Sequence, residues 1–275
     1  MLLSIITICL NNCLGIKKTY KSIATLLERK NVEWIVIDGM STDGTIEFLN
    51  SHKKEIAYLI SEKDTGIYNA MNKGVVVAKG EYLVFLNAGD SLTNVFLNSD
   101  VLNILSHCCS DIVYGDYIQK NNDGSIVEIK QPSMLSVYFF IGNNLCHQSI
   151  FFKRSLFDTD LYDESYKVAS DLAFLLKKIF TDNCTYEHID VPICIYEKGG
   201  MSDVHYFDIT RPEIRKIVSE YVGGYYIYDS VLFRKELDNE HIFDMIDFLA
   251  RRQKLKFVVE KLLKITLSFY KKVMM

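Results

Sequence analysis

The stretch GEYLVFLNAGD, residues 80–90, joins an apolar run to four small or polar residues. The run YLVFL, residues 82–86, has the length and the aromatic and branched side chains of a buried strand. Asn87, Ala88, Gly89 and Asp90 follow it directly. Such an ending is either a polar turn or the edge of a site that holds a cation, so the rest of the sequence has to decide between the two.

Strand-like runs alternate with segments of helical periodicity over the first hundred residues. The strand-like runs are residues 2–10, 32–39, 57–64 and 81–90, and the helical segments are residues 16–29, 41–51 and 67–80. This alternation predicts the α/β class, with a parallel sheet covered by helices. Ligands of such sheets bind at the carboxyl ends of the strands, where this chain has Asn11, Asp38, Asp64 and Asp90.

The rest of the chain predicts a less regular half and a helical end. It reads as a β-hairpin over residues 111–130 with its turn at 122–124, a strand over 145–152, a helix over 170–180 capped by Ser170 or Asp171, and a strand with a glycine loop over 185–202. The pattern turns helical from about Arg211. We expect one domain over residues 1–205, with halves at 1–105 and 106–205, and a helical C-terminal region over 206–275.

The composition predicts a globular protein of the cytosol. A hydrophobic content of 49% is ample for a core. No stretch approaches the roughly 20 uncharged apolar residues of a membrane span, and the first residues lack the basic flank and cleavage site of a signal peptide. The seven cysteines form no CxxC pair, which indicates reduced thiols rather than a metal-thiolate site.

A basic tail follows an acidic body. Eight basic residues and one acidic residue lie between Arg251 and Lys272, although the whole chain has a formal charge of −4. The body therefore lacks the basic surface that a nucleic acid requires, and we expect no nucleic-acid partner. As a helix, residues 251–272 would have an apolar stripe flanked by lysines, which predicts binding to an anionic membrane surface. The alternative is a helix that packs on the acidic body.

The loop after the first strand does not hold phosphates by a known glycine motif. Its sequence, NNCLGIKK, contains neither GxGxxG nor GxxxxGK[ST], so neither a dinucleotide fold nor a P-loop is supported. The simplest other way to hold phosphates is a divalent cation, Mg²⁺ or Mn²⁺, bound by carboxylates at the strand ends.

Four motifs in order resemble the nucleotide-sugar-binding half of inverting family-2 glycosyltransferases with the GT-A fold. They are Thr7 with DGMSTDGT at 38–45, SEKD at 61–64, AMNKG at 70–74 and GEYLVFLNAGD at 80–90. His147-Gln148 and the segment DLAFLLK at 171–177 are similar to the acceptor-side motifs of that family. The resemblance covers roughly residues 1–205. It implies a Rossmann-like GT-A domain with a mostly parallel central sheet, whose first half binds the nucleotide-sugar and whose second half faces the acceptor.

The resemblance also implies a site for a UDP-sugar. Asp38 would accept a hydrogen bond from the imide N–H of uracil, with Thr7 and Asn11 lining the base pocket. The alternative is that Asp38 begins an Asx turn. The implied nucleotide-sugar ligands are Thr7, Asn11, Asp38, Asp64, Asn72, Asn87, Ala88, His147 and Lys198. Among these, His147 could instead be a structural hydrogen-bonding residue, and Lys198 would neutralise the leaving diphosphate from a glycine loop.

Two positions depart from the family pattern. The usual Asp-x-Asp followed by Asp reads Asn87-Ala88-Gly89-Asp90, so Asp90 is the one charged metal ligand that the motif keeps. We therefore expect weak metal binding in the absence of the donor diphosphate. Met71 stands where many members have arginine, and the neighbouring Lys73 could substitute for that charge.

The catalytic base implied by the acceptor motif is Asp171, which would take the proton of the acceptor hydroxyl during an inverting displacement. The alternative is that Asp171 caps the helix that begins there. The full hypothesis is a metal-dependent glycosyltransferase of polysaccharide, O-antigen or other lipopolysaccharide synthesis. It would act on a lipid-linked or oligosaccharide acceptor, as a peripheral protein at the inner face of the cell membrane. Its rivals are a sugar nucleotidyltransferase, whose basic glycine-rich loop is absent here, and a non-catalytic nucleotide-sugar-binding relative.

Overall fold

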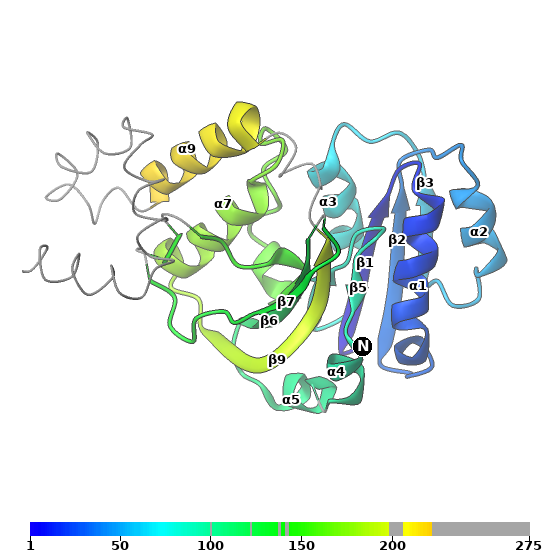
Figure 1. The fold of residues 1–275 in the computed structure, drawn as a ribbon, viewed down its shortest axis with the longest axis horizontal. Coiled ribbons are helices and arrows are strands. Elements are labelled where there is room, and N and C mark those ends of the chain that lie inside the picture. The colour runs from blue at the N-terminus through cyan, green and yellow to red at the C-terminus, as the bar shows by residue number, and fades with distance from the viewer. Residues whose placement is uncertain (100, 122, 137–138, 141–142, 198–205, 222–275) are drawn as a thin grey trace, which may run out of the picture. The chain divides into compact units, whose positions relative to one another are not determined.

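A nine-stranded sheet forms the centre of the part of the chain that the computed structural model describes, residues 1–221 apart from 100, 122, 137–138, 141–142 and 198–205 (Figure 1). The strands are β1 (Leu3–Cys9), β2 (Val32–Asp38), β3 (Tyr58–Ser61), β4 (Tyr82–Phe85), β5 (Ser91–Leu92), β6 (Ile112–Lys120), β7 (Ile126–Ile129), β8 (Ile150–Lys153) and β9 (Tyr186–Glu197). Their order is β3-β2-β1-β4-β8-β6-β9-β5, with β7 paired to β6. The first four strands are parallel and β8 joins them antiparallel, so the predicted α/β fold with a mostly parallel sheet is confirmed.

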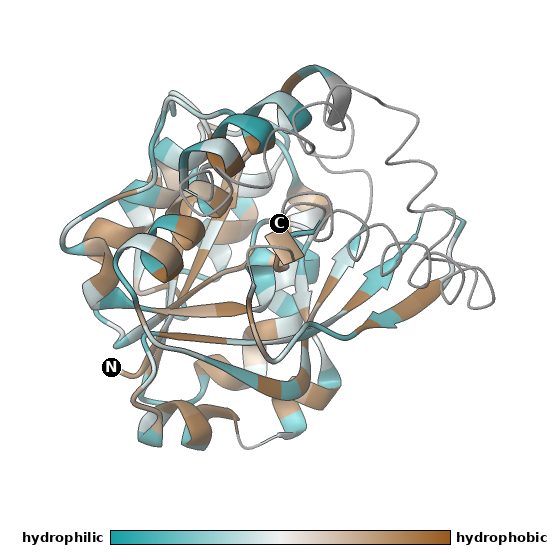
Figure 2. Cartoon of the chain, turned by 90° about the vertical axis from the view of Figure 1, so that its left-hand side faces the viewer, coloured by the Kyte–Doolittle hydropathy of each residue, from teal (hydrophilic) through white to brown (hydrophobic). Residues whose placement is uncertain are grey.

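Helices cover both faces of the parallel half. The α-helices are α1 (Cys13–Leu27), α2 (Thr45–Ser51), α3 (Ile67–Val77), α4 (Asn94–Asn98), α5 (Val101–His107), α7 (Ser170–Leu176) and α9 (Arg211–Tyr221). Shorter turns of other helix types are η1 (His147–Ser149), η2 (Arg154–Phe157), η3 (Lys177–Thr181) and η4 (Tyr206–Thr210). The central strands carry mostly hydrophobic residues in Figure 2, as expected for a sheet buried on both faces.

Successive residues of β1 point to opposite faces, which divides the core into two layers. Ile5 belongs to the cluster that also contains Ile16 and Ile23 of α1. Its neighbour Ile6 points the other way and touches α3, where a Cβ on Gly74 would lie 2.5 Å from the Ile6 Cγ2 atom. The absence of a side chain at residue 74 therefore sets how closely α3 can approach β1.

Several predicted boundaries are wrong for local reasons. Helix α1 begins three residues earlier than expected, because Asn12 caps it by accepting a hydrogen bond of 2.9 Å from the Gly15 N–H. Helix α2, expected from residue 41, begins at Thr45, directly after Gly44, which has a left-handed conformation at φ 95°. The strand expected over 145–152 is confined to β8, since His147 to Ser149 form the turn η1.

Other expectations hold in the described residues. The predicted hairpin is β6 paired with β7, and the strand expected from residue 185 is β9. The helical pattern expected from Arg211 is α9, and all seven cysteines are free thiols. The glycine loop and the basic tail, residues 251–272, lie outside the described residues. Among the helices described, none is both long and apolar enough to cross a membrane.

Replacement of Gly74 by alanine tests the close approach of α3 to β1. We expect Gly74→Ala to lower the free energy of unfolding by about 1–3 kcal/mol, because the new methyl group overlaps Ile6 in a closely packed core. Gly66→Ala is the matched control, because a Cβ on Gly66 meets no atom within 4 Å and the backbone there is extended. Urea denaturation of both variants measures the difference. Equal stability of the two variants would contradict the packing argument.

Candidate active site

A cleft of about 620 Å³ lies where β4 and β9 end. Its walls come from segments far apart in the sequence: the residues after β4, the start of α3, the residues around η1, the start of α7, and β6 with the end of β9. Its lining consists of Asn12, Ile67, Tyr68, Met71, Asn87, Ala88, Gly89, Asp90, Tyr117, Asn144, Leu145, Cys146, His147, Gln148, Val168, Asp171, Tyr196 and Glu197. Five predicted site residues, Asn87, Ala88, Asp90, His147 and Asp171, therefore share one cleft.

The turn at residues 87–90 is fixed by side chains of α1 and its N-cap. Asn12 donates to the carbonyl of Ala88 at 2.9 Å, and Lys18 donates to the carbonyl of Gly89 at 2.7 Å. Thr19 has no exposed surface; its hydroxyl accepts from the Gly89 N–H at 3.0 Å and donates to the carbonyl of Asp90 at 2.7 Å. Gly89 has φ 112°, which is rare for residues with a side chain.

The Asp90 carboxylate is partly buried in the cleft. This burial raises the pKa of Asp90 to about 6, although a hydrogen bond from the Gln148 amide and the charge of Lys18 favour the ionised form. The Gln148 nitrogen lies 3.1 Å from the Asp90 Oδ2 atom. The surroundings of Asp90 in the protein therefore stabilise its ionised carboxylate poorly.

The oxygens at the end of β4 fit a divalent cation. The Asn87 Oδ1 atom is buried without a hydrogen-bond partner among the described residues. Burial of an unpaired oxygen costs free energy unless a ligand binds to it. Amide and carboxylate oxygens are the ligands that Mg²⁺ and Mn²⁺ prefer. No group of three or more His, Cys, Asp or Glu side chains within the described ranges could hold a metal ion. Asn87 and Asp90 would therefore need further oxygen ligands from a bound substrate or from water.

Asp171 lies in the first turn of α7, and the Tyr68 hydroxyl donates to its Oδ1 atom at 2.8 Å. Burial and the charge of Asp171 raise the pKa of Tyr68 well above its usual value, so Tyr68 stays protonated as a donor. The prediction that Ser170 or Asp171 caps this helix is wrong. The N-cap residue is Ala169, and the Ser170 Oγ atom is buried without a hydrogen-bond partner in the described residues.

His147 lies in the wall of the cleft with its ring mostly buried. Its ring is stacked on Phe85 at 5.0 Å between centroids, and its Nε2 atom is 2.9 Å from the Tyr162 hydroxyl. Burial lowers the pKa of His147, so the ring is neutral at pH 7. These contacts agree with the structural role considered from the sequence, and a role in binding the diphosphate stays a prediction.

Two residues expected at the base pocket are buried beneath the loops. The Thr7 hydroxyl has no exposed surface and accepts a hydrogen bond of 2.9 Å from the Trp34 indole. Asp38 is equally buried and accepts hydrogen bonds from the Ser41 N–H and from the Ser61 hydroxyl. Asp38 thus begins a turn, as the alternative proposed. In this conformation of the loop it presents no surface to a base, and its contact with uracil stays a prediction.

The remaining predicted ligands lie outside the lining of the cleft. Asn11 is exposed with φ 47°, and its Oδ1 atom accepts from the Thr42 N–H at 2.8 Å. Asp64 is paired with Lys73 at 2.6 Å, which leaves Lys73 engaged away from the cleft, so it does not substitute there for the missing arginine. Asn72 is buried and bonds both the N–H and the carbonyl of Tyr162. Lys198 lies outside the described residues.

Four lining residues were missed from the sequence as site residues. Gln148 was quoted in a motif without a role, although it bonds Asp90, and nothing local marked Tyr68 as the partner of Asp171. Glu197 ends β9 and pairs with Lys18 at 2.9 Å, which holds its pKa below the usual range. Tyr117 contributes an aromatic ring beside Tyr196. Among these four, Glu197 ends a strand, whereas Gln148 lies in η1, Tyr68 at the start of α3 and Tyr117 inside β6, so the sequence offered no shared signal for them.

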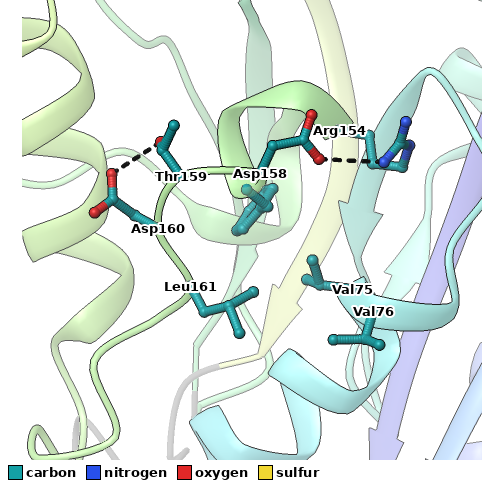
Figure 3. Close-up of a pocket in the computed structure, with 8 residues that line it drawn as sticks. Val75, Val76, Arg154, Asp158, Thr159, Asp160 and Leu161 are labelled. Carbon is teal, nitrogen blue, oxygen red and sulfur yellow. Dashed lines mark hydrogen bonds and ion pairs between the residues drawn. The ribbon is translucent and has the colours of Figure 1, made fainter.

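A second hollow lies beside the C-terminal end of α3 (Figure 3). Val75, Val76 and Leu161 line its apolar part, and the Arg154 guanidinium pairs with Asp158 at 3.4 Å. Asp160, the other charged side chain of this lining, pairs with Lys177 and Lys178, so both carboxylates of the hollow already have cationic partners.

A partly buried carboxylate near an unpaired amide oxygen, in one strand-end cleft with a second carboxylate, fits an α/β enzyme that acts on a phosphate-bearing substrate. The chain belongs to glycosyl transferase family 2, whose model matches residues 4–158, and it is a glycosyltransferase. Membership of this family favours sugar transfer over nucleotidyl transfer.

Curated relatives and solved structures agree with this assignment. The chain is 33% identical over 180 residues to a PGL/p-HBAD biosynthesis glycosyltransferase of Mycobacterium bovis. The matched region covers 62% of this chain and 68% of the relative. Its fold is similar to that of S. aureus TarS 1–349 in complex with UDP (TM-score 0.58, 17% identity, 83% of this chain and 72% of that chain). It is also similar to glucosyl-3-phosphoglycerate synthase of Mycobacterium tuberculosis in complex with Mn²⁺ and UDP (TM-score 0.55, 15% identity, 81% and 80%).

Replacement of Asp90 tests the cost of its burial. We expect Asp90→Asn to raise the free energy of unfolding of metal-free protein at pH 7.5, by up to about 2 kcal/mol, because a neutral amide avoids the cost of burying the charge. A raised folded-state pKa means that the carboxylate increasingly destabilises the fold as pH rises from the usual pKa of an aspartate to about 6. The gain in the variant should therefore shrink as pH falls from 7.5 to 5 in urea denaturation.

Asp43→Asn provides the control of opposite sign. Hydrogen bonds from Thr45 and Cys13 hold the pKa of Asp43 below its usual value, so its replacement should lower stability at pH 7.5. An Asp90→Asn protein that is less stable than the parent at pH 7.5 would contradict the account of Asp90.

Proposed function

We propose that this glycosyltransferase transfers a sugar from a UDP-sugar to a lipid-linked or oligosaccharide acceptor with inversion at the anomeric carbon. The single observation that carries the proposal is that Asp90 and Asp171 both line one cleft. The presence of UDP in complexes of TarS and of glucosyl-3-phosphoglycerate synthase supports uridine as the base. We propose the synthesis of a cell-surface polysaccharide, such as an O-antigen, as the pathway.

The reaction is a single displacement. The acceptor hydroxyl oxygen attacks the anomeric carbon, the carbon–oxygen bond to the diphosphate breaks, and UDP leaves with that electron pair. Asp171 takes the proton of the acceptor hydroxyl, and general-base help of this kind contributes about 10²–10⁴ in rate. Tyr68 keeps the Asp171 carboxylate oriented by its hydrogen bond to one oxygen, which leaves the other oxygen for the proton.

The donor diphosphate binds at the end of β4. Asp90 and the Asn87 amide oxygen would hold Mn²⁺ or Mg²⁺ together with phosphate oxygens of the donor. Such an ion, when bound, supplies positive charge that stabilises the leaving diphosphate. The protein supplies the fixed turn, because its backbone carbonyls at residues 88–90 are already bonded to Asn12, Lys18 and Thr19. Ala88 and His147 would border the same part of the donor.

Further residues and segments would take part in the reaction. We propose that Asp38 accepts a hydrogen bond from the imide N–H of uracil with Thr7 and Asn11 lining the base pocket, that Asp64 and Asn72 bind the nucleotide-sugar, and that Lys198 neutralises the diphosphate. Residues 1–205 would form the catalytic domain and residues 206–275 the C-terminal region. The enzyme would work as a peripheral protein at the cytoplasmic face of the membrane.

A donor panel tests the reaction. We expect UDP release from at least one UDP-sugar in the presence of Mn²⁺ or Mg²⁺, and a fall of about 10²–10⁴-fold in that rate for Asp171→Asn, because the amide cannot take the proton. Asp158→Asn is the control, since its exposed pair with Arg154 contributes little and lies outside the cleft. Full activity of Asp171→Asn would refute the base. Calorimetric binding of UDP without turnover of any donor would favour the non-catalytic alternative.

Charge removal in the tail tests the membrane proposal. We expect replacement of four tail lysines by glutamine to reduce co-sedimentation of the full-length protein with anionic liposomes, since each basic residue near such a surface contributes about 1 kcal/mol. The residues are Lys261, Lys264, Lys271 and Lys272. The control replaces four exposed lysines of the body, Lys30, Lys53, Lys54 and Lys63. Equal loss of sedimentation in the two proteins would refute a specific role of the tail.

A further inference from the structure

The backbone that leads into α7 is held by a residue from a different helix. Glu213, in the first turn of α9, accepts hydrogen bonds from the backbone N–H groups of Lys167 at 2.7 Å, Val168 at 3.0 Å and Ala169 at 3.1 Å. Hydrogen bonds to an ionised acceptor are stronger than those between neutral groups. One carboxylate therefore satisfies three consecutive backbone donors that directly precede Ser170, the first residue of α7.

Local side chains do not perform this function. Helix α7 has Ala169 as its N-cap residue, with no capping hydrogen bond from a side chain. The Ser170 hydroxyl, which stands next in the chain, is buried without a hydrogen-bond partner in the described part of the protein. Asp171 is engaged with Tyr68 instead of the backbone before it. The position of residues 167–169 therefore depends on Glu213.

The rest of α9 holds Glu213 against this segment. Residues at i, i+3 and i+4 share one face of a helix, as Glu213, Lys216 and Ile217 do. The Lys216 ammonium lies 4.7 Å from the ring centroid of Tyr166, and Ile217 has no exposed surface. Figure 1 shows α9 running beside α7, in agreement with the contacts between them. The face that carries Glu213 is thus the face that packs on the catalytic part of the chain.

The held segment leads directly into the cleft. Val168 lines the cleft, and its own backbone N–H is one of the three that Glu213 fixes. Asp171 follows two residues after Ala169, in the first turn of α7. A displacement of residues 167–169 would therefore move both Val168 and the Asp171 carboxylate relative to the turn at residues 87–90.

We propose that Glu213 is a positioning residue of the transfer reaction: it fixes the start of α7 and, through it, the reach of Asp171 to the acceptor hydroxyl. This inference rests on the proposed role of Asp171 as the base. It gives the region after residue 205 a part in catalysis that is separate from membrane binding. Misplacement of a catalytic group by about 1 Å can cost about 10²-fold in rate, so a small shift is enough for a measurable effect.

Substitution of Glu213 in the full-length protein tests the inference. We expect Glu213→Ala to lower kcat by about 10- to 100-fold with a donor KM within twofold of the parent, because the donor side at residues 87–90 is held independently by α1. Glu213→Gln keeps the length of the side chain and one acceptor oxygen, so its kcat should lie between those of the parent and of Glu213→Ala. Glu220→Ala, an exposed carboxylate of the same helix, is the matched control and should leave kcat unchanged.

Amide hydrogen exchange gives a readout that does not depend on activity. We expect faster exchange at residues 167–169 in Glu213→Ala and, to a smaller degree, in Glu213→Gln, with protection of the β1–β4 strands unchanged. If Glu213→Ala unfolds, Glu213→Gln carries the same comparison. Unchanged kcat, or unchanged exchange at these three amides, would overturn the inference.

Failure of the inference is distinguishable from failure of the proposed function. Asp171→Asn is assayed beside the Glu213 variants with the same donor. Full activity of Asp171→Asn would overturn both the base and the positioning role. An inactive Asp171→Asn together with a fully active Glu213→Ala would overturn the positioning role alone.

Discussion

The attachment of the turn at residues 87–90 to helix α1 is the constraint on which the rest of the site depends. Thr19 is completely buried, and its hydroxyl accepts from the Gly89 N–H and donates to the Asp90 carbonyl. Asn12 and Lys18 donate to the carbonyls of Ala88 and Gly89. Strand β1, which precedes α1, lies between β2 and β4 in the middle of the parallel half. The positions of Asp90 and Asn87 are therefore set by the buried elements β1 and α1. Their oxygens are already in place before a substrate binds.

This rigid turn carries groups that the protein itself leaves unsatisfied. Burial raises the pKa of Asp90 to about 6, and the Asn87 Oδ1 atom lacks a partner within the described residues. Both features are unfavourable in the unliganded protein, and both become favourable when positive charge arrives. The reduced acidic motif fits the proposed metal site: a single carboxylate would limit charge repulsion in the absence of a ligand, and cation binding would then depend on the phosphates of the donor.

The sequence predicted the strand ends well and the directions of side chains poorly. The alternation of runs located β1 to β4; Asp90 was predicted from its place after a strand and from the family motif, and Asp171 from the acceptor motif. Asp38 also ends a strand, but its side chain turns inward to Ser41, as those of Thr7 and Asn72 turn to Trp34 and Tyr162. The partners that decide this lie 3 to 90 residues away, and the capping of α7 by Glu213 spans more than 40 residues. No periodicity within a window can encode such pairs.

The sheet order has a consequence for the folding of the enzyme during its synthesis on the ribosome. Strands β1 to β4 pair with one another, and the turn at 87–90 is completed by α1, so these contacts need little more than the first ninety residues. The contact between Tyr68 and Asp171 closes a separation of 103 residues, and Glu213 follows later still. Local contacts form before distant ones during synthesis from the N-terminus. A nascent chain would thus form the proposed donor side at residues 87–90 well before the proposed base, Asp171, is in place. It would stay inactive until α7 and α9 have been synthesised.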